Sequence, residues 1–227
     1  MRAVVYGHSE PVTLGVLRGA LERGGFEITE RFREVRPGDA DAELIVVLGG
    51  FMGVYELDAH PYLREELSLV EERLSRDRPV LGVCLGAQMM ARAAGSHVGP
   101  DPKGMFVGAE RVTLKDGRTL DLAAWHGDRF EPIPHAESLA ASARHPQEIF
   151  RLGRSGIGIL THPEASPETF AQWVRQFPQS VQRAGRSEEE LLREDLPRLH
   201  AAHPKTLAYL DELVAYLRSF QSASALA

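Results

Sequence analysis

Residues 78–95 read RPVLGVCLGAQMMARAAG, and this stretch decides both the fold class and the expected chemistry. The apolar run Pro79 to Val83 is long enough for one buried strand, and the residues from Leu85 predict a largely apolar helix that ends at Gly95. Between strand and helix lies a G-x-C-x-G turn, with Cys84, the only cysteine of the chain, at its centre. We therefore expect a strand that turns directly into a helix around a strained, exposed cysteine.

The position of Cys84 favours a nucleophile. The positive end of a helix stabilises a thiolate and can help to stabilise an oxyanion. A lone cysteine is more often a small buried apolar residue. The preceding strand, the paired glycines and the immediate helix outweigh that alternative, and a nucleophile then needs a base.

Composition limits the class of protein. The 227 residues are 43% hydrophobic and 26% charged, which are ordinary globular values, and suffice for one α/β domain. The net charge of −6 argues against a nucleic-acid partner. The single cysteine fits a reducing compartment. The N-terminus lacks the apolar core of a signal peptide. The most apolar run, 44–54, is too short and too rich in glycine to span a bilayer. We expect a cytoplasmic, soluble protein without a membrane partner.

The first part of the chain alternates strands and helices, which predicts a doubly wound α/β sheet. The helix at Pro61–Leu74 has one apolar stripe, and its charged face is expected to be solvated. The expected elements are a strand at Ala3–Tyr6, a helix at Pro11–Arg23, an edge strand at Phe26–Phe32, a central parallel strand at Leu44–Leu48 and that helix.

After Gly95 the pattern changes to an antiparallel hairpin, three short strands and a helical tail. The hairpin is expected at Phe106–Leu114 and Arg118–Trp125, and the short strands at Ser138–Ala143, Glu148–Leu152 and Ile157–Leu160. Helices are expected from Pro167, with a capping box at Ser187 and Glu190. The last helix is expected to have an apolar stripe of Leu207, Leu210, Val214 and Leu217, and residues 222–227 are expected to fray. No domain boundary is evident. We expect one domain over 1–227, with 181–227 a helical extension packed on it.

Two short segments follow predicted buried strands, where ligands bind in α/β sheets. Gly49-Gly50 comes after the central strand, and bare backbone N–H groups there can point at an oxyanion; a tight turn without chemistry is the alternative. His162 comes after the last strand and suits the base that Cys84 needs, with Glu164 to fix its tautomer. His-Pro-Glu also occurs in ordinary loops. Surface or packing roles are expected for the other histidines His8, His60, His97, His135, His145, His200 and His203.

These motifs carry a resemblance to a known family. LGG at 48–50, PVLGVCLGAQ at 79–88, WHGD at 125–128 and GILTHPE at 158–164 come in the order seen in class I glutamine amidotransferases, most of all the stand-alone GMP synthase-like branch. The resemblance covers about residues 40–175. It implies a three-layer, flavodoxin-like fold with a mostly parallel sheet and an added antiparallel hairpin.

The same resemblance implies roles for named residues. It implies a catalytic triad of Cys84, His162 and Glu164, and an oxyanion hole from the backbone N–H groups of Gly50 and Leu85. It also implies a substrate pocket, with the residues Gly49, Gln88, His126 and Asp128.

The chain departs from the family pattern at two places. The family usually has an aromatic residue before the triad histidine, where this chain has Leu160-Thr161. After the helix that follows the cysteine, the family often has Glu and a Gly-Trp pair, where this chain has Lys103-Gly104-Met105-Phe106. Neither departure removes a chemical group from the triad, and both bear on the shape of the substrate pocket.

The reaction implied is cysteine-dependent hydrolysis of the glutamine side-chain amide through a γ-glutamyl thioester, which releases ammonia for an acceptor. No phosphate-binding loop occurs, so a synthase would be a separate subunit. The alternatives are a self-sufficient γ-glutamyl hydrolase or peptidase, and a non-catalytic binding or regulatory protein on the same fold. No cofactor is expected, and His126 with Asp128 is too small a set to predict a metal site.

Overall fold

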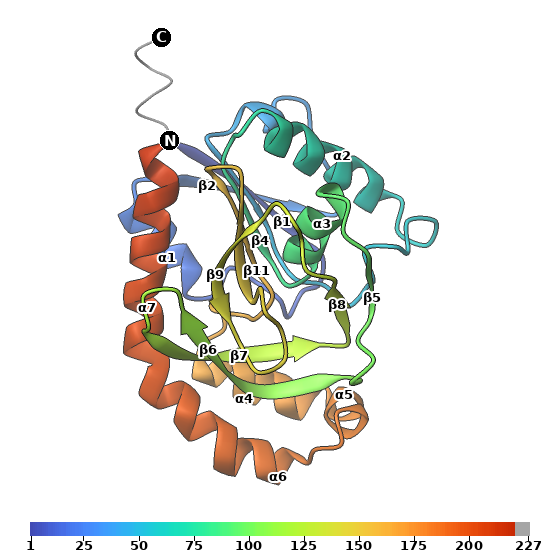
Figure 1. Cartoon of the computed structure of the whole chain (residues 1–227), viewed down its shortest axis with the longest axis vertical. Coiled ribbons are helices and arrows are strands. Elements are labelled where there is room, and N and C mark those ends of the chain that lie inside the picture. The colour runs from blue at the N-terminus through green and yellow to red at the C-terminus, as the bar shows by residue number, and fades with distance from the viewer. Residues whose placement is uncertain (221–227) are drawn as a thin grey trace.

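A computed structural model describes residues 1–220, and its centre is a large mixed sheet of nine strands (Figure 1). The expected fraying at 222–227 lies outside the described residues. In spatial order the strands are β2 (Glu27–Phe32), β1 (Arg2–Gly7), β3 (Leu44–Val47), β4 (Val80–Val83), β11 (Gly156–Ile159), β10 (Ile149–Leu152), β9 (Glu137–Ala141), β6 (Phe106–Leu114) and β7 (Thr119–His126).

The sheet has a parallel half and an antiparallel half. Strands β2, β1, β3, β4 and β11 pair in parallel, and β2 forms the predicted edge. The strands β3 and β4 are buried along their whole length, as their continuous apolar sequence predicts. The hairpin β6–β7 is confirmed, and β9 and β10 join it to the parallel half through antiparallel pairs.

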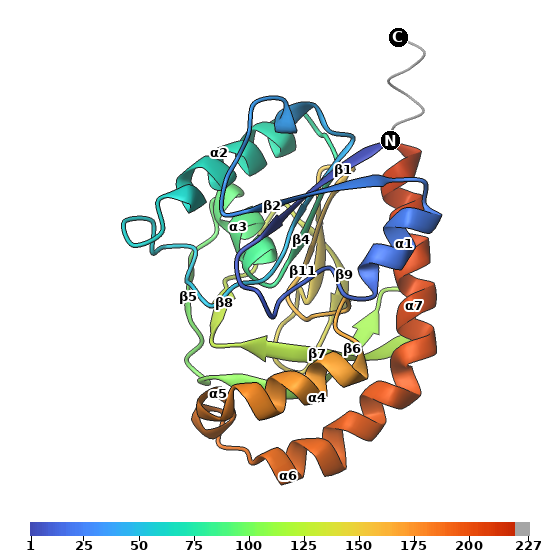
Figure 2. The same cartoon turned by 180° about the vertical axis from the view of Figure 1, so that it is seen from behind.

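Helices cover both faces of the sheet, which confirms the three-layer α/β class. Apolar residues of α1 (Leu17–Arg23) and α7 (Leu196–Ser219) pack on one face, and those of α2 (Tyr62–Ser75) and α3 (Leu85–Ala93) pack on the other. Figure 2 shows the same layers from behind, with α1 and α7 along one side and α2 and α3 along the other. A short 3₁₀ helix η1 (Asp39–Asp41) precedes β3.

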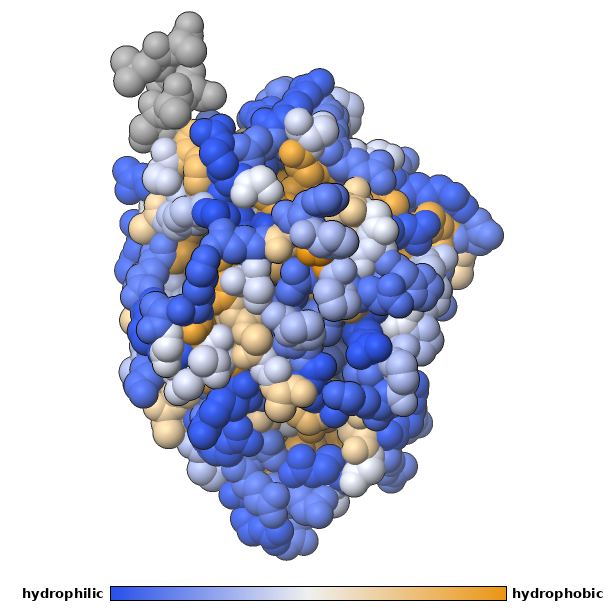
Figure 3. All heavy atoms as spheres, in the orientation of Figure 1, coloured by the Kyte–Doolittle hydropathy of each residue, from blue (hydrophilic) through white to orange (hydrophobic). Residues whose placement is uncertain are grey.

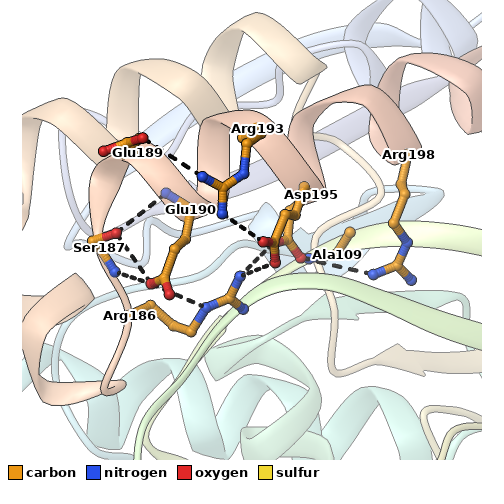
Figure 4. Close-up of polar contacts among 9 residues, drawn as sticks. Ala109, Arg186, Ser187, Glu189, Glu190, Arg193, Asp195 and Arg198 are labelled. Atoms are coloured by element: carbon orange, nitrogen blue, oxygen red, sulfur yellow. Dashed lines mark hydrogen bonds and ion pairs between the residues drawn. The ribbon is translucent and has the colours of Figure 1, made fainter.

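The helices after β11 wrap around the β6–β7 hairpin. They are α4 (Pro167–Gln176), α5 (Pro178–Arg183), α6 (Glu188–Glu190) and the π-helical turn η2 (Leu191–Asp195). The predicted capping box of Ser187 and Glu190 is present. In Figure 4, Asp195 ties this segment to the sheet: its carboxylate accepts the Ala109 N–H at 2.7 Å and pairs with Arg186 at 2.8 Å.

The local structure differs from the sequence analysis at two places. The first helix begins at Leu17 rather than Pro11, because the N–H of Val16 donates to the carbonyl of Glu164 at 2.9 Å and holds the preceding segment against that loop. The sequence analysis also missed a two-stranded antiparallel sheet of β5 (Val98–Pro100) and β8 (Asp128–Phe130), whose strands are only three residues long.

The expected solvated face of α2 is also incorrect for two residues. Glu66 and Arg73 are fully buried. The guanidinium of Arg73 donates to the carbonyls of Ala42 and Pro79, both at 2.6 Å, and burial lowers its pKa to about 9. Its positive charge therefore ties α2 to the loops around β3 and β4 instead of facing water.

The face in Figure 3 is mostly hydrophilic, with small apolar groups scattered between charged side chains. On α7, Leu210, Val214 and Leu217 are buried as predicted, whereas Leu207 is only partly buried. Within residues 1–220 no helix combines the length and the apolar character needed to cross a membrane.

Candidate functional site

Cys84 lies between β4 and α3 in a backbone conformation that side chains rarely adopt, and it is buried rather than exposed as expected. Its φ is 51° and its ψ is −103°, and Leu85 begins the helix at once. The Cys84 N–H donates to the carbonyl of Ile159 on the neighbouring strand at 2.8 Å. Such strain at a non-glycine residue persists only where the surrounding structure enforces it, and it is concentrated at functional sites.

The two glycines of G-x-C-x-G are required by close packing. A Cβ at Gly82 would lie 2.5 Å from the carbonyl of Gly86, and a Cβ at Gly86 would lie 2.1 Å from the carbonyl oxygen of Val47. The turn at Cys84 is therefore tight enough to press the start of α3 against both β4 and β3. The two glycines are therefore spaced around Cys84 as this close packing requires.

His162 and Glu164 reach the same edge of the sheet as Cys84. Strand β11 is the parallel neighbour of β4, with Ile159 opposite Val83, so the residues after each strand emerge together. The Nδ1 of His162 lies 2.7 Å from Oε1 of Glu164, and both side chains are buried. Because Nδ1 is occupied, the other ring nitrogen is the one left to interact with the Cys84 thiol.

The charges around His162 favour the protonated form of its ring, an imidazolium. Burial alone would lower the pKa of His162, but the negative charges of Glu164 and Cys84, with hydrogen bonds to both, raise it well above its ordinary value. The ring is held by an edge-on contact with Trp173, at 5.2 Å between centroids. The Cys84 sulfur also lies 4.0 Å from the carbonyl oxygen of Trp125.

Gly49 and Gly50 follow β3 and lie against these side chains. A Cβ at Gly49 would be 3.0 Å from Cε1 of His162 and 3.5 Å from Cβ of Cys84, and one at Gly50 would be 3.0 Å from Cδ2 of Leu85. In residues 1–220 the N–H groups of Gly50 and Leu85 have no hydrogen-bond acceptor. Two free backbone donors thus border the cysteine.

A cleft opens from Cys84 and has an apolar and a polar part. Aromatic rings dominate the apolar part, which is lined by Val12, Phe51, Trp125, His162, Trp173 and Phe177 besides Gly50 and Cys84. The polar part holds about 750 Å³ of empty space when the open solvent at its mouth is included. Three of the predicted pocket residues line it, namely Gln88, His126 and Asp128, whereas Gly49 does not.

The predicted pocket residues have distinct electrostatic properties. Burial, reinforced by the charges of His162 and Arg144, lowers the pKa of His126 to about 4, so its ring is neutral. Neither ring nitrogen of His126 has a partner within the described residues. Burial raises the pKa of the Asp128 carboxyl, and the Asp128 carbonyl accepts a hydrogen bond from Gln88 at 3.3 Å. His126 therefore has hydrogen-bonding capacity to offer a ligand.

The sequence analysis missed several residues of the cleft. Glu56, Ser180 and Arg183 line its polar part together with Tyr55. Ser180 and Arg183 belong to α5, in the helical tail that was interpreted only as packing. No local signal marks them, because they reach the cleft only through the fold of the tail around β6 and β7.

One departure from the family pattern faces the cleft and the other does not. Met105 lines the polar part beside His126. Leu160 is buried in the apolar cluster that includes residues of α2 and α3, and Thr161 is fully buried with no partner for its hydroxyl within residues 1–220. Met105 is thus the departure from the family pattern that lies where it can affect substrate binding.

Comparison with known proteins agrees with this architecture. The chain is similar to a crystal structure of a glutamine amidotransferase from Thermotoga maritima, with 25% identity, 96% of each chain covered and a TM-score of 0.76. It is 27% identical to the glutamine amidotransferase-like protein YfeJ of Salmonella typhimurium over 65% of this chain and 68% of that protein.

Two relatives with named reactions match over shorter regions. A glutamine-hydrolyzing GMP synthase of Thermomicrobium roseum is 34% identical over 54% of this chain and 23% of the synthase. Gamma-glutamyl peptidase 5 of Arabidopsis thaliana is 28% identical over 44% of this chain and 46% of the peptidase. The family model for class-I glutamine amidotransferases matches residues 24–179, more than half of the chain. This chain therefore belongs to the class-I glutamine amidotransferase family.

Proposed function

We propose that the chain hydrolyses the side-chain amide of glutamine through a γ-glutamyl thioester on Cys84. The observation that carries the proposal is the meeting of a strained cysteine, a buried His162–Glu164 pair and two free backbone N–H groups at one edge of the sheet. A nucleophile, a base with its orienting carboxylate and oxyanion donors are what acyl transfer requires.

In the first half-reaction the Cys84 thiolate attacks the amide carbon, and the carbonyl electrons move to oxygen. The N–H groups of Gly50 and Leu85 donate to that oxyanion. As the oxyanion collapses, the C–N bond breaks and the imidazolium of His162 gives its proton to the leaving nitrogen, which departs as ammonia. The raised pKa of His162 supports this role, because the proton is in place before the attack.

In the second half-reaction water replaces the thiolate. Neutral His162 takes a proton from the water, the resulting hydroxide attacks the thioester carbon, and the C–S bond breaks to give glutamate and the Cys84 thiolate. Glu164 holds Nδ1 throughout and stabilises the imidazolium that forms again. Oxyanion donation is worth about 10²- to 10³-fold in rate for each donor.

Charges in the cleft support a γ-glutamyl substrate. The far end of glutamine carries an α-ammonium and an α-carboxylate, which need charges of both signs. The polar part of the cleft offers the carboxylates of Glu56 and Asp128 and the guanidinium of Arg183. We assign Arg183 to the α-carboxylate and the two acidic side chains to the α-ammonium.

Two forms of this activity can be distinguished by experiment. In the first, a separate synthase subunit receives it, as the similarity to a GMP synthase suggests. In the second, the chain is a self-sufficient γ-glutamyl hydrolase or peptidase, as the similarity to a gamma-glutamyl peptidase suggests. The polar cleft is open at its mouth, which leaves room for a group attached to the γ-carbonyl.

The test is ammonia release from L-glutamine by the purified chain, beside a panel of γ-glutamyl peptides and the Cys84→Ala variant. Cys84-dependent release from glutamine supports the glutaminase, and turnover confined to peptides supports the hydrolase. If neither is turned over and the Cys84 thiol is unreactive with iodoacetamide at neutral pH, the chain is a binding protein on this fold.

A further inference from the structure

A second histidine–carboxylate pair is buried behind the two glycines. His8 follows β1, and Glu66 lies on α2; both side chains have no exposed surface. His8 Nε2 lies 2.7 Å from Oε2 of Glu66, and His8 Nδ1 lies 3.1 Å from the carbonyl oxygen of Gly49. The expectation of a surface or packing role for His8 does not account for this chain of hydrogen bonds.

Proton counting fixes the direction of these bonds. A carbonyl oxygen can only accept, so His8 Nδ1 carries a hydrogen that it donates to Gly49. The short contact between Nε2 and Glu66 must also contain a proton, on either the ring or the carboxyl group. The two contacts therefore hold two protons, one of which His8 Nδ1 donates to the Gly49 carbonyl.

The Gly49 carbonyl and the Gly50 N–H belong to the same peptide unit. A trans peptide is planar, and its C=O and N–H point in opposite directions. No cis peptide occurs in residues 1–220. A hydrogen bond that holds the Gly49 carbonyl toward His8 Nδ1 therefore also fixes the direction of the Gly50 N–H, and Gly50 lines the cleft together with Cys84.

This peptide needs an external anchor. Two consecutive glycines have no side chains to restrict their backbone, so the unit between them can rotate easily. His8 is itself fixed: Arg33 donates twice to its carbonyl, at 2.9 and 2.7 Å, and the ring of Tyr62 stacks on it at 6.2 Å between centroids. The anchor is thus held by its neighbours, whereas the anchored segment has no side chains to restrict its backbone.

We propose that His8, supported by Glu66, is a positioning residue that presets the Gly50 N–H as an oxyanion donor. The inference rests on the proposed function for its catalytic consequence. His8 does not touch substrate, because it is fully buried and the Gly49–Gly50 peptide separates it from the cleft. The competing explanation is a buried polar pair that only stabilises the fold.

Two amide variants of His8 separate these explanations. An asparagine places its donor near the position of Nδ1, and can still reach the Gly49 carbonyl. A glutamine places its donor near the position of Nε2, and reaches Glu66 instead. The two side chains have the same chemistry, so a loss confined to His8→Gln assigns the effect to the bond with Gly49.

The kinetic arm compares two reactions of Cys84 in each folded variant. Acylation by a chromogenic γ-glutamyl anilide passes through an oxyanion, whereas alkylation by iodoacetamide does not. We expect the acylation rate of His8→Gln to fall by up to about 10²- to 10³-fold, which is the loss caused by removing one oxyanion donor, while KM stays nearly unchanged. Alkylation stays at the wild-type rate, and His8→Asn recovers most of the acylation. Equal acylation by His8→Gln and wild type would overturn the proposal.

The spectroscopic arm does not depend on activity. The carbonyl ¹³C resonance of Gly49 reports the hydrogen bond that it accepts, and it is expected to move in His8→Gln but not in His8→Asn. An unmoved resonance in His8→Gln would overturn the anchoring itself. A wild-type protein that never acylates would refute the proposed function, while this resonance would still decide whether His8 holds the peptide.

Discussion

Replacing Gly86 by alanine is the most direct perturbation of the packing that strains Cys84. The new Cβ would lie 2.1 Å from the carbonyl oxygen of Val47 and 2.8 Å from its carbonyl carbon. Both atoms are backbone and cannot rotate away. To reach 3.0 Å, the distance below which real Cβ atoms essentially never come, the first contact must open by about 0.9 Å between α3 and β3.

That displacement has two measurable costs. Overpacking a well-packed site costs about 1–3 kcal/mol, which for a chain of this size lowers Tm by about 2 to 12 °C. The same shift moves Cys84 and Leu85 relative to Gly50, and a misplacement of about 1 Å can reduce a rate about 10²-fold. Gly86→Ala should therefore lose more activity than its stability at the assay temperature explains.

Thermal unfolding and ammonia release from glutamine test this prediction together. The matched control is Gly19→Ala on α1, where the new Cβ would meet only the flexible end of Arg23 at 3.0 Å. That change should stabilise the helix by about 0.5–1 kcal/mol and leave turnover unchanged. A Gly86→Ala protein with wild-type Tm and wild-type turnover would refute the packing argument.

Three further predictions concern the charged groups of the site. Glu164→Gln removes the largest contribution that raises the pKa of His162, so the NMR titration of that ring should move to lower pH and kcat/KM should fall by about 10²- to 10⁴-fold; an unmoved titration would contradict the pairing. The pKa of His126 is about 4 in the folded state and near 6.5 in the unfolded state, so the unfolded chain binds the proton more tightly. The free energy of unfolding should therefore fall by about 3 kcal/mol as pH drops from 6.5 to below 4. Denaturant titrations of His126→Phe should no longer show this loss of stability in acid, and its persistence would count against the assignment. Arg183→Gln should raise KM for glutamine about 10- to 100-fold at similar kcat, whereas the exposed Arg175→Gln should not; equal KM values in initial-rate measurements would exclude Arg183 from substrate binding.

The fold was predictable because its signals are local. Continuous apolar runs at β1, β3 and β4 and the spacing of the helices between them indicate a parallel sheet, and the hairpin β6–β7 follows from its turn. The first helix was predicted too long because the segment before Leu17 is held by Glu164, a contact between residues far apart in the sequence. Such contacts leave no periodic pattern.

The candidate site was predictable only where it lies at strand ends. Cys84, Gly50 and His162 each follow a strand, so their meeting could be foreseen, although their catalytic roles stay predictions. His8 and Glu66 could not be identified, since one histidine after a strand and one glutamate on a mixed-charge helix are ordinary features. Arg183 reaches the cleft only because the tail wraps around β6, where Asp195 binds Ala109.

The proposed reaction requires a covalent γ-glutamyl intermediate at Cys84. We would mix the wild-type chain with L-glutamine or a γ-glutamyl peptide, quench in acid, and locate any added mass by peptide mapping. The account predicts one γ-glutamyl group on the peptide that contains Cys84, absent after hydroxylamine treatment and absent in Cys84→Ala. Turnover of the substrate with no adduct on Cys84, or an adduct that survives in Cys84→Ala, would contradict it.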